Sequence, residues 1–99
     1  MSKNDAGASS PLAGKAVPRN LLIDTDALAK HYYGIFPELS DPAQRVSFGT
    51  SGHRGSSLKG SFTEAHVLAI AQAICDYRRL MHLDGPVFVG MDTHLLSAL

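Results

Sequence analysis

The stretch Val46-Ser47-Phe48 followed by Gly49-Thr50-Ser51-Gly52-His53-Arg54-Gly55 decides the fold of this 99-residue chain. Its first three residues are typical of a short strand, and the three glycines that follow at intervals of three predict a loop. Glycine lets backbone N–H groups turn inward and lets a ligand approach the chain closely. Arg54 adds a fixed fork of donors that suits phosphate oxygens. We interpret the loop as a phosphate or sugar-phosphate site, and the alternative is an ordinary turn between strand and helix.

A long amphipathic helix is predicted after the glycine loop. Ser61-Phe62-Thr63-Glu64 matches a capping box, which is a signature of a helix start. Apolar residues then recur at steps of three and four, which is the period of one helix face; they are Val67, Ile70, Ile74, Tyr77 and Met81, widened by Leu68, Ala71 and Cys75. We expect a helix over residues 63–82 that is mostly buried, with Cys75 as a core residue.

A second strand is predicted beyond that helix, because Val87-Phe88-Val89 follows the Gly85-Pro86 break and is apolar on both sides. Strand, loop, helix and strand make a βαβ unit with a right-handed crossover. Ligands collect at the carboxyl ends of parallel strands, so the glycine loop and Met91-Asp92-Thr93-His94 should open on the same side of the sheet. Asp92 and His94 could serve proton or phosphate chemistry, or they could simply be solvated.

The first part of the chain divides into two regions. Residues 1–20 are rich in Ala, Ser, Gly and Pro without an apolar period, which predicts a flexible N-terminal segment. Residues 21–99 are expected to form the domain. They start with a short helix that Asp24 caps, that presents Leu28 and Tyr32 on one face, and that Gly34 ends.

Composition excludes several classes of protein. Nine basic and nine acidic residues cancel, which argues against nucleic acid or an anionic membrane as the main partner. Cys75 is the only cysteine, so no intrachain disulfide is possible and a reducing cytoplasm is the expected location. The first residues lack the apolar stretch of a secretory signal, and no apolar run approaches the length of a membrane span, so we expect neither a signal peptide nor a membrane-spanning segment. The isolated His31, His66 and His82 lack zinc-ligand spacing and are interpreted as surface or satisfied, partly buried side chains.

The glycine loop matches none of three common loop motifs. It lacks the Gly-Lys-Ser/Thr of a Walker A loop, and its first two glycines are three apart, unlike those of the dinucleotide fingerprint. His53 stands where a hydrolase elbow built on Ser51 would need glycine.

The motifs taken in order resemble the N-terminal region of bacterial phosphoglucomutases, in the α-D-phosphohexomutase superfamily. The residues that carry the resemblance are Phe48-Gly49-Thr50-Ser51-Gly52-His53-Arg54-Gly55-Ser56, Phe62, Glu64-Ala65-His66, Ala69-Ile70-Ala71-Gln72-Ala73-Ile74 and Val89-Gly90 before Asp92-Thr93-His94. The resemblance implies an incomplete three-layer α/β/α fold over residues 21–99, the first domain of an isomerase. Such enzymes interconvert glucose 1-phosphate and glucose 6-phosphate through a phosphoserine, Mg²⁺ and glucose 1,6-bisphosphate.

Carried over to this chain, the resemblance implies that Thr50, Ser51, His53 and Arg54 face the phosphoserine and the sugar phosphate. The family's Ser-His-Asn-Pro nucleophile segment and Asp-Gly-Asp metal loop are absent, and Met91 replaces the usual Lys or Arg. We therefore assign no catalytic or metal-ligating residue, and we expect no cofactor to bind this chain tightly. We expect an inactive N-terminal piece of marginal stability. The alternatives are a non-catalytic phosphosugar-binding module, including one that docks onto a complete mutase, or an inert truncated gene product.

Overall fold

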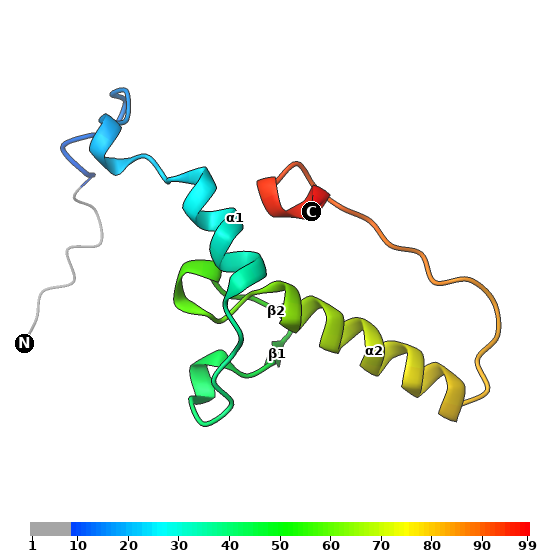
Figure 1. Ribbon diagram of the computed structural model, residues 1–99. Coiled ribbons are helices and arrows are strands. Elements are labelled where there is room, and N and C mark those ends of the chain that lie inside the picture. Colours follow the sequence, from blue (N-terminus) through cyan, green and yellow to red (C-terminus); the bar gives the residue numbers. More distant parts are fainter. Residues whose placement is uncertain (1–8) are drawn as a thin grey trace, which may run out of the picture.

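The computed structural model describes residues 9–99, in which two α-helices meet at a short β-hairpin (Figure 1). Helix α1 spans Thr25–Gly34, the strands β1 and β2 span Phe48–Gly49 and Gly52–His53, and helix α2 spans Glu64–Leu80. Single 3₁₀ turns, η1 to η4, cover Arg19–Leu21, Pro42–Gln44, Ser57–Lys59 and Leu95–Ala98. The architecture is mixed α/β and agrees with a partial α/β/α domain, which confirms the expected fold class. Residues 1–8 of the expected flexible segment lie outside the described residues.

Helix α1 forms as its sequence predicts. The carboxylate of Asp24 accepts hydrogen bonds from the N–H groups of Asp26 and Ala27, at 3.1 Å each, and so caps the helix. Gly34 is the last helical residue. The apolar face buries Tyr32, and the helix packs against η3 and α2.

The strand predicted over residues 46–48 forms instead at Phe48–Gly49, as β1, and it pairs with an antiparallel strand where a parallel one was predicted. The chain reverses at Thr50-Ser51, so that β1 and β2 pair antiparallel, with Phe48 opposite His53 and Gly49 opposite Gly52. Gly52 has a φ of +113°, a conformation that residues with a side chain rarely adopt. The glycine loop is therefore itself a tight hairpin.

Helix α2 begins within one residue and ends within two residues of its predicted bounds, but its cap is different. Thr63 precedes the first helical residue, and its N–H donates to Nδ1 of His66 at 3.0 Å. The Ser61 hydroxyl instead accepts from the N–H of Ser56 at 2.9 Å. The predicted Ser61–Glu64 capping box was thus wrong in register, because Ser61 is needed by the preceding loop.

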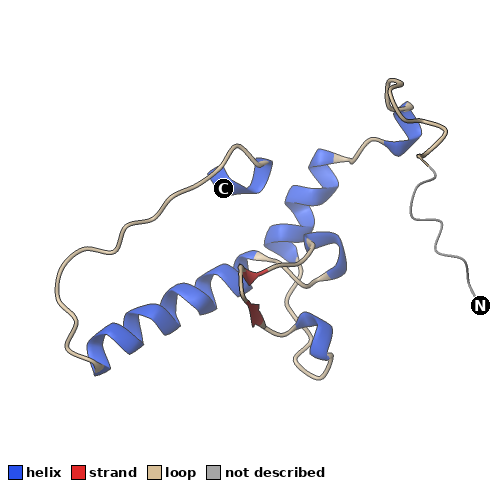
Figure 2. Ribbon diagram, turned by 180° about the vertical axis from the view of Figure 1, so that it is seen from behind, coloured by secondary structure: helices blue, strands red, loops and turns tan. Residues whose placement is uncertain are grey.

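The prediction that α2 is mostly buried was wrong. His66 is the one buried residue of this helix, whereas Ile74 and Tyr77 are 47% and 58% exposed. Cys75, expected in the core, is exposed as well. No sheet covers the apolar face of α2 in the described part of the chain (Figure 2).

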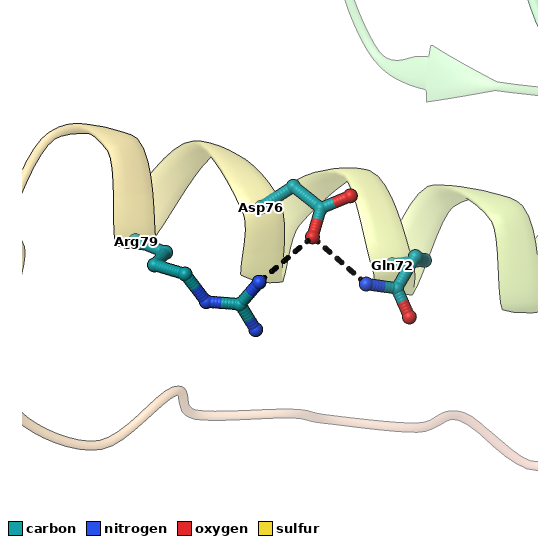
Figure 3. A network of polar contacts seen from close by, with 3 residues as sticks. All are labelled: Gln72, Asp76 and Arg79. Atoms are coloured by element: carbon teal, nitrogen blue, oxygen red, sulfur yellow. Dashed lines mark hydrogen bonds and ion pairs between the residues drawn. The ribbon is translucent and has the colours of Figure 1, made fainter.

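The polar face of α2 carries a small network of exposed side chains (Figure 3). The amide of Gln72 donates to Oδ1 of Asp76 at 2.9 Å, and the guanidinium of Arg79 lies 3.7 Å from the same oxygen. Exposed contacts of this kind contribute little to stability, so the polar face of α2 adds little to the stability of the helix.

The predicted second strand does not form. Val87-Phe88-Val89 has no strand partner within residues 9–99, and its side chains are 50%, 92% and 89% exposed. The segment belongs to an extended stretch that leads from the end of α2 back to η4, which contacts α1 (Figure 1). A parallel strand needs a neighbour, and β1 is committed to its antiparallel hairpin; the predicted βαβ unit is consequently not assembled.

The solvent-accessible surface of the chain is large, which means that the arrangement is open. It amounts to 8570 Å², against the roughly 5,500 Å² that a compact chain of this mass would expose. Tyr32 is the one buried apolar side chain in the described part, and the other buried side chains are those of Ser57, Thr63 and His66. The centre of the structure is thus a polar junction between α1, the hairpin and the start of α2.

The approach of Gly55 to Ser61 predicts a specific effect on stability. A Cβ atom on Gly55 would overlap the backbone carbonyl of Ser61, whereas a Cβ on Gly49 would meet open space. We expect Gly55→Ala to lower the free energy of unfolding by about 1–3 kcal/mol, because the backbone must shift to relieve the overlap. Urea denaturation followed by circular dichroism measures the difference. Gly49→Ala is the matched control, and equal losses in both variants would contradict the prediction.

The environment of Tyr32 predicts an alkaline weakening of the fold. Burial, and to a lesser degree the charges of Glu64 and Tyr33, raise the pKa of the Tyr32 phenol. The folded state therefore favours the neutral phenol, and this stabilisation is intact below the unfolded pKa of about 10 and lost as pH rises through the folded pKa. Above about pH 10 the free energy of unfolding should fall more steeply in the unaltered chain than in Tyr32→Phe.

Urea denaturation over a series of alkaline pH values tests this expectation. Tyr77→Phe keeps Tyr32 and removes an exposed phenol, so it should follow the unaltered chain. If the free energy of unfolding falls with pH equally steeply in Tyr32→Phe and in the unaltered chain, ionisation of Tyr32 does not cause the alkaline weakening.

Candidate functional site

The glycine hairpin lines a shallow, open concave surface that encloses a volume of about 410 Å³. The lining residues come from the two strands, the turn and their flanks; they are Ser47, Gly49, Thr50, Ser51, Gly52 and Arg54. Three of the four site residues expected from the sequence, Thr50, Ser51 and Arg54, are therefore brought together on one surface. They meet because the tight turn places the ends of β1 and β2 side by side.

The donors on this surface are available to a ligand. Thr50, Ser51 and Arg54 are exposed. Within residues 9–99 the one ion pair between Lys or Arg and a carboxylate joins Arg79 to Asp76, so no carboxylate neutralises the guanidinium of Arg54. A guanidinium beside two hydroxyls and glycine backbone is suited to bind the oxygens of a phosphate group.

His53, the fourth expected site residue, is turned away from this surface. Its Nε2–H donates to the carbonyl oxygen of Ser61 at 2.8 Å, and its Nδ1 accepts from the N–H of Ser47 at 3.1 Å. The imidazole thus spans from the residue before β1 to the loop that precedes α2. In this conformation both ring nitrogens are engaged by backbone groups.

His66 has a central position that the sequence interpretation described only as that of a satisfied, partly buried histidine. The side chain is 2% exposed, and its Nε2–H donates to the carbonyl oxygen of Gln44 at 2.6 Å. That bond ties the start of α2 to η2, 22 residues earlier in the chain. The Thr63-x-x-His66 spacing is the signal that could have revealed it, since histidine here takes the place of the capping-box glutamate.

Three rings of the hairpin and of the start of α2 stack in pairs. The rings of His53 and Phe62 are nearly parallel, with centroids 5.8 Å apart and an interplanar angle of 12°. The rings of His53 and His66 lie 5.2 Å apart at 18°. We call Phe62, His53 and His66 the ring column.

The second predicted loop is not part of this site. None of residues 91–94 lines the surface on the hairpin. Asp92 instead accepts from the N–H of His94 at 2.9 Å and from the hydroxyl of Ser97, next to η4. The expectation that both loops open on one side of a sheet was wrong here, because no parallel sheet aligns them in the described residues.

Residues 45–99 match the family model described as phosphoglucomutase/phosphomannomutase, alpha/beta/alpha domain I. A phosphoglucomutase of Komagataeibacter xylinus is 54% identical over 88 residues, which cover 89% of this chain. The matched region amounts to 16% of that relative's length. In the part of the chain that the structure describes, no helix is both long and apolar enough to cross a membrane.

The contacts of Asp92 predict how its carboxyl titrates. The Ser97 hydroxyl and then the His94 N–H hold the pKa of the Asp92 carboxyl below its ordinary value. These two hydrogen bonds stabilise the turn fully when the pH is above the ordinary pKa of an aspartate. The stabilisation is lost as the pH falls through the lowered pKa of Asp92. Ser97→Ala should move the pKa of Asp92 upward, toward the ordinary value.

Carboxyl ¹³C chemical shifts, followed through an acid titration, measure that pKa directly. Thr93→Ala removes a neighbouring hydroxyl that makes no bond to Asp92, so it serves as the control. An unchanged titration of Asp92 in Ser97→Ala would contradict the assignment.

Proposed function

Because the chain belongs to the phosphoglucomutase/phosphomannomutase family, we propose that it is part of a mutase acting on glucose phosphates. The proposed reaction interconverts glucose 1-phosphate and glucose 6-phosphate. A phosphoserine donates its phosphoryl group to the sugar, and the resulting glucose 1,6-bisphosphate turns around. Its other phosphoryl group then returns to the serine.

The contribution of this chain is to bind phosphate through the glycine hairpin. The observation that carries the proposal is the concave surface on which Thr50, Ser51 and Arg54 converge without a neutralising carboxylate. Donors that are already in place where charge develops are usually the largest contribution to phosphoryl transfer. Arg54 offsets the negative charge, and the two hydroxyls orient the phosphate oxygens.

The described residues do not supply a magnesium site. No group of three or more His, Cys, Asp or Glu side chains that could hold a metal ion occurs among residues 9–99. The hairpin surface itself is lined by no carboxylate. The residues of this chain therefore assign no role to Mg²⁺. The phosphoserine likewise has no counterpart in the sequence, which lacks a Ser-His-Asn-Pro segment.

For the chain alone, we propose weak phosphosugar binding without turnover, in the cytoplasm. Support for the location comes from the single, unpaired cysteine. Mixing the purified chain with glucose 1-phosphate, glucose 1,6-bisphosphate and Mg²⁺ tests the absence of turnover. Formation of glucose 6-phosphate above the background rate would overturn this part of the proposal.

Substitution of Arg54 tests the binding role. We expect Arg54→Gln to weaken binding of glucose 6-phosphate by roughly tenfold, because a hydrogen bond to a charged group is lost. The measurement is the shift of the Gly49–Gly55 amide resonances during titration. Arg79→Gln removes an equal charge on the exposed face of α2 (Figure 3) and should leave the affinity unchanged. Equal affinities of both variants and the unaltered chain would exclude Arg54 as a ligand.

A further inference from the structure

We propose that His53 and His66 are positioning residues that hold the glycine hairpin in its phosphate-binding conformation. The inference rests on the proposed phosphate-binding role of the hairpin. Neither histidine lines the concave surface, and both belong to the ring column. They act on the ligand through Thr50, Ser51 and Arg54.

The hairpin needs such support because it is very small. Each strand has two residues, and an isolated two-stranded hairpin is at best marginally stable in water. Phe48, opposite His53, is 62% exposed, so burial of its ring does little to hold β1 in place. Side-chain contacts in addition to the strand pairing must therefore fix the conformation of its turn.

His53 supplies two of these contacts. Its Nδ1 accepts the N–H of Ser47, at the entrance to β1, and its Nε2–H reaches the carbonyl oxygen of Ser61. One imidazole thereby links the first strand to the loop before α2. Since His53 is itself the last residue of β2, both strands are fixed to that loop through a single side chain.

His66 anchors the other end of the column. It is buried, it accepts the N–H of Thr63 at Nδ1, and it donates from Nε2 to the carbonyl oxygen of Gln44. Its ring is therefore fixed at the start of α2. The ring of His53 stacks on the ring of His66 and also on that of Phe62.

The partners determine which ring nitrogen carries the proton. A carbonyl oxygen can only accept, so Nε2 of both His53 and His66 must carry hydrogen. The backbone N–H groups of Ser47 and Thr63 can only donate, and they lie 3.1 and 3.0 Å from the Nδ1 atoms of His53 and His66, so both Nδ1 atoms act as acceptors without hydrogen. The carbonyl oxygen of Ser47 is farther from Nδ1 of His53, at 3.3 Å, and the hydroxyl of Thr63, 3.0 Å from Nδ1 of His66, is able to donate to it. His31 provides an internal contrast, because its Nδ1 faces the carbonyl oxygen of Ala27 at 2.7 Å and must carry the proton instead.

Nuclear magnetic resonance of the ¹⁵N-labelled full chain at about pH 8, where histidine is mostly neutral, tests the proton positions. Long-range ¹H–¹⁵N correlations of the imidazoles should assign hydrogen to Nε2 in His53 and His66 and to Nδ1 in His31. An Nε2 without hydrogen in either His53 or His66 would overturn the proposed arrangement.

Three substitutions of His53 separate its two hydrogen bonds. In His53→Asn the side-chain oxygen can replace Nδ1 as acceptor for Ser47, and in His53→Gln the amide nitrogen can replace Nε2 as donor to Ser61. His53→Phe keeps a stacking ring and loses both bonds. We expect the Ser47 amide to exchange rapidly with solvent in His53→Phe and His53→Gln, and to stay protected in His53→Asn.

Titration with inorganic phosphate gives the functional readout. Binding should weaken roughly tenfold in His53→Phe and by less in His53→Asn and His53→Gln, because each of these retains one link. His82→Asn is the control, since His82 lies beyond α2 and asparagine tolerates its φ of +53°. An unchanged circular dichroism spectrum in each variant shows that the comparison is made between folded chains.

The outcomes distinguish the inference from the proposed function. If the unaltered chain binds phosphate and His53→Phe binds it equally well with a protected Ser47 amide, the positioning role is overturned alone. If the unaltered chain shows no response to phosphate, the proposed function is overturned and the positioning role with it. Weaker binding together with faster exchange at Ser47 supports both.

Discussion

The hydrogen bond from Nε2 of His66 to the carbonyl oxygen of Gln44 is the contact on which the rest of the described structure depends. It is short, at 2.6 Å, and it joins η2 to the first turn of α2 across 22 residues of chain. Because His66 is buried, loss of this bond would leave a polar atom without water or partner, which is more costly than loss of an exposed contact. Within residues 9–99 no buried side-chain nitrogen or oxygen lacks a partner, so the junction is fully satisfied.

A polar junction of this kind gives the chain local order without a large apolar core. Ser57 illustrates the arrangement, since its buried hydroxyl donates to the carbonyl oxygen of Phe62 at 2.6 Å. Hydrogen bonds are directional and fix geometry, whereas hydrophobic burial is the main source of folding free energy and is little used here. The hairpin is consequently well defined while the two helices remain largely exposed. This division suits a segment whose part in the proposed function is to present a few donors in fixed positions.

The sequence could predict the features that local chemistry determines. Asp24 and Gly34 bound α1 as expected, and the apolar period located α2 to within two residues. Long-range pairing was not accessible in the same way: the strand at Val87-Phe88-Val89 depended on neighbours that the described chain does not provide. At the site, residue types identified the donors on the hairpin, but not the inward turn of His53. That orientation is set by Ser61 and His66, which no local pattern around residue 53 reveals.

The extended, exposed run at Val87-Phe88-Val89 has a consequence for how copies of this chain meet. Three consecutive side chains that favour β structure, with no strand bonded to their backbone, offer a template onto which another extended segment can add. Pro86 borders the run on its N-terminal side, but none of the three residues carries a charge that would oppose such addition. In concentrated solution this run is the point at which self-templated β-aggregation would start.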